Sequence, residues 1–468
     1  MIERERVSPE ENRPVSDGSL IAIPSTVVTA GRARWHDELT PSHWRILFAS
    51  FLGWTFDGYE SYALFIVLPF ALQDILTPMQ ARSTAVWAGV AISTTLLGWG
   101  TGGLIGGTLA DYIGRKQMML YSVLLYGTFT GLTGLSTNFT SFAGLRFLTG
   151  LAMGSEWSTG VTLVAETWPD RARPKGCGFL QSGFGWGALF ASVVWWMSNG
   201  TNLLGIHSWR LMFAVGALPA FFTLYIRRAI KESEKWIQAV REHRWAATEE
   251  TKDIAATARR PFTLVEIVRE RESRRRILLT FLLSLASVVG WWAVSSWLPG
   301  YAQHLASTQG YRNAAQWGAR AALFYTSGAI VGYPISGFVI DAIGRRKFLF
   351  VTYLGALLMT AVTYLWTHSV EGLLSVAAIN GFFTMSWAYT WMAIYPAELF
   401  TSTVRSSAIS FIFNGTRMIA WIFPIIAGSI IQRFGGTPHA AVALGGIYML
   451  GLIVPWFVPE TVGKALPA

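Results

Sequence analysis

Long apolar runs dominate the chain after residue 45, and short polar segments separate them. Each run is close to the about 20 residues that a helix needs to cross about 30 Å of hydrocarbon. A chain in hydrocarbon must also bond its own backbone groups, so the pattern predicts an all-α polytopic membrane protein. The twelve predicted spans are 46–71, 86–109, 117–136, 140–164, 177–198, 209–229, 277–299, 319–340, 348–366, 371–395, 406–430 and 440–458.

One polar motif occurs twice between these runs. Gly107–Lys116 reads Gly-Thr-Leu-Ala-Asp-Tyr-Ile-Gly-Arg-Lys, and Gly337–Lys347 reads Gly-Phe-Val-Ile-Asp-Ala-Ile-Gly-Arg-Arg-Lys, with the two aspartates separated by half the chain. A second pair of acidic and basic landmarks repeats at nearly the same offset. Two landmarks at nearly one offset indicate an internal duplication. The members of the second pair are Glu166 with Arg173, and Glu398 with Arg405.

The duplication divides the twelve spans into two halves of six. It predicts a cytoplasmic N-terminal tail at 1–45, a six-helix bundle at 46–229, a cytoplasmic loop at 230–276, a second six-helix bundle at 277–459 and a cytoplasmic tail at 460–468. An even number of spans places both termini on the same side of the membrane.

Composition and charge agree with a membrane protein. Apolar residues make up 52% of the chain, charged residues 14%, and the mean hydropathy is +0.39. The net charge of +10 does not point to nucleic acid, because Arg227–Arg276 alone holds 14 of the 37 basic residues, mixed with 9 acidic ones. Basic loops that all face one side follow the positive-inside rule, which predicts a cell inner membrane with both termini in the cytoplasm.

Several kinds of chemistry have no sequence support. The single cysteine, Cys177, excludes an intramolecular disulfide. No Gly-x4-Gly-Lys-Ser/Thr loop is present, residues 1–45 lack the apolar core of a signal peptide, and the seven histidines fall outside the predicted spans. We therefore expect no metal and no cofactor, with a proton gradient as the energy source and any coupling proton carried by a carboxylate.

The repeated motif resembles the signature loops of the major facilitator superfamily, which lie between spans two and three and between spans eight and nine. Arg146 with Gly150 and Gly154 resembles its span-four motif, and Pro459–Gly463 resembles the terminal motif of sugar-porter-like members. The first signature departs from the family at Tyr112, where a basic residue is usual. The resemblance implies twelve helices in two pseudo-twofold-related six-helix bundles, a transporter rather than an enzyme, alternating access, and function as a monomer in the lipid bilayer.

The resemblance also implies a role for the loops. In the family, the loop aspartate lies against the N-terminus of span eleven, where the positive end of the helix dipole favours it, and locks the two halves outward-facing. The alternative is a basic loop that only fixes the topology. The implied gating residues are Asp111, Gly114, Arg115, Asp341, Arg345, Glu166 and Glu398.

Ionisable residues inside the spans are few, and such residues are expensive enough in a bilayer to indicate function. Asp57 and Glu60 are three residues apart on one face of span one. Counting about 1.5 Å per residue from the cytoplasmic end, Arg146 falls near the level of Glu60, and Glu156 lies at a depth of roughly 12 Å from the same side. We predict that these four residues carry a proton, because clustered carboxylates raise one another's pKa. The alternative is a structural Arg–carboxylate pair.

Arg417 falls near mid-depth in span eleven and shares a helix face with Asn414. A guanidinium there offers a planar fork suited to a carboxylate, so we predict an anchor for an anionic substrate. A salt bridge across the bundle to Asp57, Glu60 or Glu156 is the alternative. Further substrate-binding candidates, which could equally bond or pack against neighbouring helices, are Gln181, Asn380, Tyr59, Trp186, Trp291, Trp292, Tyr389 and Trp391.

Two stretches narrow the branch of the superfamily. The Asp57–Glu60 stretch, Asp-Gly-Tyr-Glu, looks like the span-one motif of aromatic-acid:proton symporters and of sialate or lactate symporters. The segments Glu156–Pro169 and Gly178–Phe184 look most like the sialate/monocarboxylate:proton group. The resemblance implies proton-coupled import of a small organic acid. Alternatives are a cationic, zwitterionic or sugar-like substrate in the same acidic cavity, or a non-transporting receptor.

Overall fold

The computed structural model describes residues 34–198, 207–242 and 263–467. The predicted tail therefore lies mostly outside the described residues, as does the middle of the predicted loop 230–276. Residues up to Asp37 form a separate unit, and everything that follows concerns the unit that begins at Glu38.

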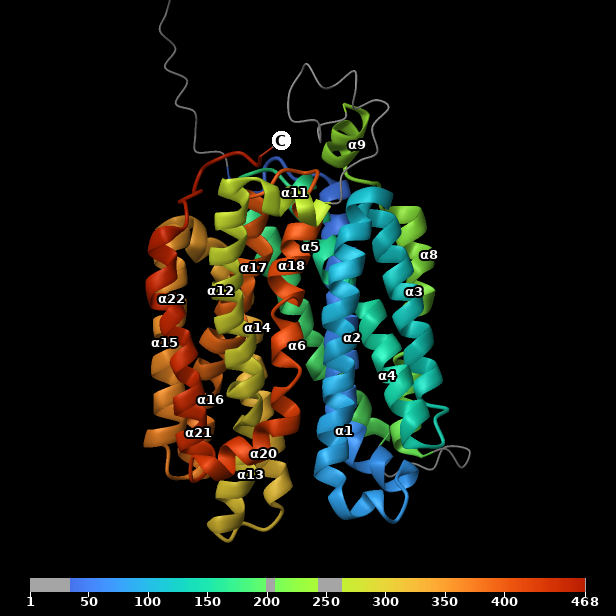
Figure 1. The fold of residues 1–468 in the computed structure, drawn as a ribbon, viewed down its shortest axis with the longest axis vertical. Helices are drawn as coiled ribbons and strands as arrows, with labels where there is room; N and C mark the ends of the chain where they lie inside the picture. The colour runs from blue at the N-terminus through green and yellow to red at the C-terminus, as the bar shows by residue number, and fades with distance from the viewer. Residues whose placement is uncertain (1–33, 199–206, 243–262, 468) are drawn as a thin grey trace, which may run out of the picture. The chain divides into compact units, whose positions relative to one another are not determined.

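The first half of this unit consists of helices joined by short connections (Figure 1). The first, α1, begins at Pro41, before the predicted span, because Pro41 takes the first helical position, where its missing N–H is tolerated. The helices are α1 (Pro41–Ile75), α2 (Thr84–Ile113), α3 (Arg115–Thr133), α4 (Phe139–Met153), α5 (Glu156–Thr167), α6 (Arg173–Ser198), α7 (Ser208–Val215), α8 (Pro219–Ala229) and α9 (Glu234–Arg241).

The second half repeats this arrangement, and in Figure 1 its yellow-to-red helices lie beside the blue-to-green helices of the first half. Two segments, Val362–Trp366 and Phe382–Trp387, have π-helical hydrogen bonding. The α-helices are α11 (Thr263–Arg269), α12 (Arg271–Ala293), α13 (Leu298–Thr308), α14 (Ala314–Ile343), α15 (Arg345–Ala361), α16 (Val370–Gly381), α17 (Ala388–Ile394), α18 (Arg405–Asn414), α19 (Arg417–Ala420), α20 (Phe423–Arg433), α21 (Thr437–Gly445) and α22 (Leu450–Ile453).

Several predicted spans are broken rather than continuous. Seven helices among the described residues are long and apolar enough to cross a membrane, or eight if α18–α19 and α20, bent by 52°, are counted as one span. The other predicted spans are helical too, but they are interrupted or more polar. Span four breaks into α4 and α5 at Gly154, which lies directly against the backbone of Trp99 and Gly103 on α2. A Cβ at position 154 would overlap that backbone, so α2 can approach the point where span four breaks only because the residue there is glycine.

The two halves pack against each other through α2 with α18 and through α6 with α14. Small residues allow these contacts: Gly178 on α6 lies against the backbone of Tyr333 and Gly337 on α14. Close approach at small residues is a general feature of helix packing in membranes. The interface that results holds the candidate site.

Candidate functional site

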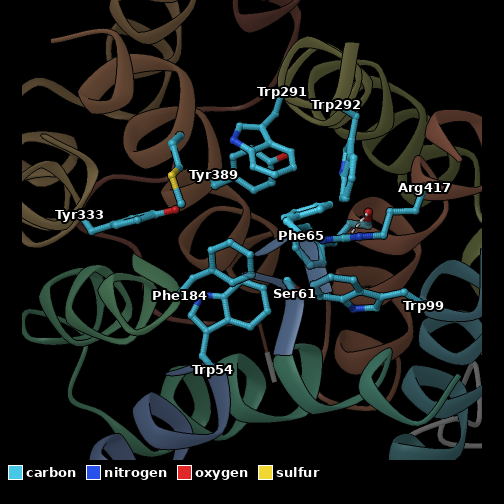
Figure 2. Close-up of a pocket in the computed structure, with 12 residues that line it drawn as sticks. Trp54, Ser61, Phe65, Trp99, Phe184, Trp291, Trp292, Tyr333, Tyr389 and Arg417 are labelled. Atoms are coloured by element: carbon cyan, nitrogen blue, oxygen red, sulfur yellow. Dashed lines mark hydrogen bonds between the residues drawn. The ribbon is translucent and has the colours of Figure 1, made fainter. Parts of the chain in front are cut away.

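A narrow cavity of about 30 Å³ lies between the two halves. Aromatic rings from both halves surround it, and Arg417 reaches into it (Figure 2). The lining residues are Trp54, Ser61, Phe65, Trp99, Phe184, Trp291, Trp292, Tyr333, Met385, Tyr389, Phe413 and Arg417. The wall is thus almost wholly apolar and carries one charged group, a guanidinium.

Arg417 begins α19, after the two-residue turn that follows α18 and before the 52° bend that separates α19 from α20. Its guanidinium carbon lies 3.7 Å from the ring centre of Phe413 and 4.4 Å from that of Trp99, so two aromatic faces hold it by cation–π contact. Its Nη1 donates to the carbonyl of Phe413 (3.1 Å) and to Oδ1 of Asn414 (3.3 Å), whereas Nε has no partner among the described residues. Within the same residues no carboxylate pairs with it, so it forms none of the alternative salt bridges. A buried cation that has no counter-ion in the described part of the chain therefore faces the cavity.

The acidic cluster lies beside the cavity rather than in its wall. Glu60 and Arg146 form an ion pair, as their predicted depth suggested. Both oxygens of Asp57 and both of Glu156 are buried and have no hydrogen-bond partner among the described residues. The charged groups that act on Asp57 are Glu156, Glu60 and Arg417. One carboxylate of the cluster is therefore neutralised locally, and two are not.

Tyr126 on α3 is a member of this cluster that sequence reasoning missed. Its hydroxyl is buried, lacks a hydrogen-bond partner in the part of the chain that the structure describes, and lies within the electrostatic reach of Asp57, Glu156 and Glu60. A tyrosine in an apolar run gives no signal of its own, because which face of α3 meets α5 depends on tertiary packing. The same holds for Trp54, Phe65, Trp99, Phe184, Tyr333, Met385 and Phe413 in the cavity wall.

The further substrate-binding candidates divide into two groups. Trp291, Trp292 and Tyr389 line the cavity. The others do not: Trp186 is 46% exposed on the outer face of α6, and the indole of Trp391 is fully buried and donates to Ser287 (3.4 Å).

Three polar candidates are occupied by hydrogen bonds to neighbouring helices, which was the alternative for them. Gln181 accepts from the Trp157 indole (2.5 Å) and donates to the carbonyl of Tyr389 (3.2 Å). The side chain of Asn380 donates to Thr363 (2.7 Å), and the hydroxyl of Tyr59 donates to the carbonyl of Met212 (2.9 Å). Because each hydroxyl or amide already has partners, we leave these residues and the outward-facing Trp186 and buried Trp391 out of the proposed site.

The first signature loop bonds across the two halves, and we call this contact the first gate. Oδ2 of Asp111 accepts from the backbone N–H (2.9 Å) and the hydroxyl (2.6 Å) of Ser407, in the first turn of α18. Arg115 holds the other oxygen of Asp111 (3.2 Å) and donates to the carbonyl of Ser402 (2.6 Å). It also pairs with Glu166 (3.1 Å). This is the geometry of a carboxylate at a helix N-terminus.

The second signature loop forms the second gate with different atoms. Asp341 pairs with the ammonium of Lys175 on α6 and with Arg345 (2.9 Å), and its side chain is 24% exposed. Arg345 also pairs with Glu398 (2.5 Å). Lys175 occupies the position that corresponds to Ser407 in the duplication. A charged side chain thus replaces the amide and hydroxyl of the first gate.

Each loop turns at a glycine with positive φ, +100° at Gly114 and +88° at Gly344, and then begins a helix. A carboxylate caps each of these helices. Glu232 accepts from the N–H groups of Arg115 (3.0 Å) and Lys116 (3.1 Å), and Glu460 does the same for Arg345 (3.0 Å) and Arg346 (3.1 Å). Sequence reasoning identified Glu460 within a terminal motif but missed Glu232.

Partial burial of Glu460 raises its pKa, but the four N–H groups of Arg345, Arg346, Val462 and Thr461 favour the charged form more strongly. The net effect holds the pKa of Glu460 below its usual range.

Residues 45–468 match the family model described as "Sugar (and other) transporter". The chain belongs to this family. The transporter is 28% identical over 428 residues to a protein of Haemophilus influenzae named "Putative metabolite transport protein", covering 90% of this chain and 98% of that protein. It is 24% identical to the sialic acid transporter NanX of Escherichia coli (92% and 98% covered) and 28% identical to the cis,cis-muconate transport protein of Acinetobacter baylyi (89% and 95%).

A solved structure has the same fold. The transporter superposes on the major facilitator superfamily proton:xylose symporter XylE with a TM-score of 0.71, covering 91% of this chain and 98% of that one at 18% identity. The predicted fold, twelve helices of the major facilitator type, is therefore confirmed, and so is the expectation of a membrane transporter rather than an enzyme.

Proposed function

We propose that this transporter imports a small organic acid together with protons across the cell inner membrane by alternating access. The observation that carries the proposal is Arg417, a buried guanidinium without a counter-ion among the described residues, in the wall of an otherwise apolar cavity. Leaving a charge unpaired in a low-dielectric site costs several kcal/mol. A substrate carboxylate removes that cost, because its two oxygens match the planar fork of the guanidinium.

The aromatic wall supports an acid with a compact apolar or planar body. Nine of the twelve lining residues are aromatic, and rings offer large flat contact area but few hydrogen bonds. A sugar-like substrate requires many polar partners, which this wall lacks. Both named substrates of the relatives carry a carboxylate: cis,cis-muconate is a planar diacid that suits such a wall, whereas sialic acid is a polyhydroxylated sugar acid and agrees only with the anion anchor.

Proton coupling rests on Asp57 and Glu156. Their oxygens are buried without hydrogen-bond partners in the described part of the chain, and they are separate from the cavity wall. A carboxylate in such a place is stable when protonated and costly when charged, so it binds and releases a proton as the cavity changes sides. Glu60, held by Arg146, sets the local charge. In this proposal the two gates close the cytoplasmic side, and both termini lie in the cytoplasm. The two six-helix halves move relative to each other, and the monomer is the functional unit.

Two competing functions make different predictions. A cationic or zwitterionic substrate would use the acidic cluster, but Asp57 and Glu156 are not among the residues that line the cavity. A non-transporting receptor would bind its ligand without accumulating it inside sealed vesicles.

The test is uptake into proteoliposomes of lactate, pyruvate, sialate, benzoate, nicotinate and xylose, with and without an inward proton gradient. We expect at least one acid, and not xylose, to accumulate only when the gradient is present. Uptake of no acid, or acid uptake that is indifferent to the gradient, would contradict the proposal.

A further inference from the structure

One side chain, that of Asn414, contacts the anion anchor and the opposite half of the molecule at once. Its Oδ1 accepts from Nη1 of Arg417 (3.3 Å), and its Nδ2 donates to the carbonyl of Gly154 (3.1 Å), in the first half. The side chain is fully buried. A single amide therefore joins the guanidinium of the cavity to the backbone of the other half.

The surroundings of Asn414 fix it tightly. The Cα of Gly103 on α2 packs so closely against the Asn414 amide that a Cβ there would overlap it. Nδ2 also donates to the hydroxyl of Ser410 (3.0 Å), which in turn donates to the carbonyl of Gly103 (2.5 Å). Gly154 is the residue where α4 breaks, just before α5 begins at Glu156. The amide thus lies at a junction of the cavity, the interface between halves and the acidic cluster.

The chemistry of the amide explains why an asparagine fits here. A guanidinium can only donate hydrogen bonds, so the carbonyl end of Asn414 must face Arg417 and the NH₂ end must face Gly154. The bond to Arg417 therefore orients the bond that crosses between the halves. An aliphatic side chain could fill the space but could make neither bond.

We propose that Asn414 is a positioning residue that couples occupancy of Arg417 to closure of the cytoplasmic side. When a substrate carboxylate takes the N–H groups of Arg417, the guanidinium is drawn toward the cavity and its bond to Asn414 is lost. Asn414 then loses the bond that holds its carbonyl end, and its bond to Gly154 weakens. The contact between α18 and α2 loses part of its stability, so substrate binding favours opening.

The single cysteine provides a readout of opening. Cys177 is fully buried on α6 and lies within the electrostatic reach of Glu398 in the other half. Separation of the halves at the cytoplasmic side would expose its thiol to a maleimide. The rate of Cys177 labelling in the purified full-length protein then reports the open fraction, and Asp111→Ala, which breaks the first gate, is the positive control.

The decisive experiment is a double-mutant cycle without substrate, so its outcome is independent of the proposed cargo. Arg417→Ala and Asn414→Ala are each expected to raise the labelling rate about fivefold, the lower end of typical coupling between sites. The double variant should label no faster than either single variant, because both remove the same link. Multiplying effects, or an unchanged rate in Arg417→Ala, would overturn the proposal.

Ser407→Ala is the matched control, because Ser407 bonds Asp111 in the same interface and is not a hydrogen-bond partner of Asn414 or Arg417. Its effect should multiply with that of Arg417→Ala. Thermal unfolding of the same variants gives a second reading of the cycle if the thiol stays unreactive. If Asn414→Ala does not fold, Asn414→Ser replaces it, since one short hydroxyl cannot span both partners.

A second arm rests on the proposed function. Benzoate or lactate at saturating concentration should raise Cys177 labelling in the unmodified protein but not in Asn414→Ala. An equal response in both proteins would overturn the coupling role of Asn414. No response in either, together with a cycle that fits, would contradict the proposed cargo and leave the coupling inference standing.

Discussion

The two halves of this duplicated chain bond to each other through the same loop but with different bonds. In the first gate, Asp111 is fully buried and accepts from a backbone amide and a hydroxyl of Ser407. In the second gate, Asp341 pairs with the charged side chain of Lys175 and is partly exposed. One gate therefore depends on a fixed helix end, and the other on an ion pair that salt can screen.

The interiors of the two halves differ even more. The first half holds the carboxylates Asp57, Glu60 and Glu156, whereas the second half holds Arg417. When the halves are aligned on their repeated acidic and basic landmarks, the position in the first half that corresponds to Arg417 is Gly185. The duplication has thus kept the gates and separated the proposed tasks, with protons in one half and anion binding in the other.

The largest expected effect comes from the anchor. Arg417→Ala should lower kcat/KM for acid uptake by about thirtyfold or more, because truncating one partner of a buried charge pair costs about 2–5 kcal/mol. Arg417→Lys should recover only part of the loss, since an ammonium lacks the planar fork. Initial rates of uptake into proteoliposomes measure both. If Arg417→Ala transports the acid normally, the assignment of anion binding to the second half is wrong.

The next effect separates proton coupling from binding. In Asp57→Asn the side chain stays neutral, so proton-driven accumulation should fall to equilibrium while counterflow exchange of the acid continues. Accumulation and counterflow are measured in the same vesicles, so that a loss of proton coupling can be told from a loss of substrate binding. Loss of both activities would assign Asp57 to substrate binding and would remove the division of tasks between the halves.

A smaller effect tests the gates against each other. Asp111→Ala leaves buried donors unpaired and should increase labelling of Cys177 more than Asp341→Ala, because Asp341 is 24% exposed and water can partly replace it beside Lys175. In Ser407→Ala, where closure depends more on the second gate, labelling should rise further with salt, since the Debye length falls from about 30 Å at 0.01 M to about 3 Å at 1 M. Equal effects of the two alanine variants would show that the gates do not differ in strength.

The smallest effect concerns the cap at Glu460. Its pKa is lowered in the folded protein, so its contribution to stability is present above the unfolded pKa of about 4.3 and is lost as the pH falls through the lower folded value. Glu460 should therefore contribute nothing to any change in melting temperature between pH 7 and pH 5. Below about pH 4.3, Glu460→Gln should flatten the decline in melting temperature. The control Glu234→Gln, at an exposed position on α9, should follow the unmodified protein.

Much of the fold follows from the sequence because a chain in hydrocarbon must satisfy its own backbone hydrogen bonds, which helices do. Twelve apolar runs and one repeated loop were enough to predict the helices and the duplication. Depth counted along a helix also placed Glu60 near Arg146, which the structure pairs. The breaks were not predictable, because the end of α4 at Gly154 depends on contact with α2, a neighbour that is distant in the sequence.

Part of the candidate site could also be predicted from the sequence. Charges in apolar runs stand out, so Asp57, Glu156 and Arg417 were visible. The aromatic residues that hold Arg417, among them Trp99, were not, because 22 tryptophans give no hint of which face a cavity. Polar side chains such as Asn380, which donates to Thr363, are ambiguous in a sequence, since a hydrogen bond within the bundle uses the same atoms as a bond to a ligand.

The carboxylates that cap α3 and α15 have a mechanical consequence. Glu232 follows the sixth span and bonds the loop before the third, and Glu460 follows the twelfth and bonds the loop before the ninth. Each cap joins two elements of the same half, whereas the gates join one half to the other. Force applied across the molecule should therefore part the gates before it loosens either cap. The protein would therefore open along the contact between its two halves while each half stays rigid.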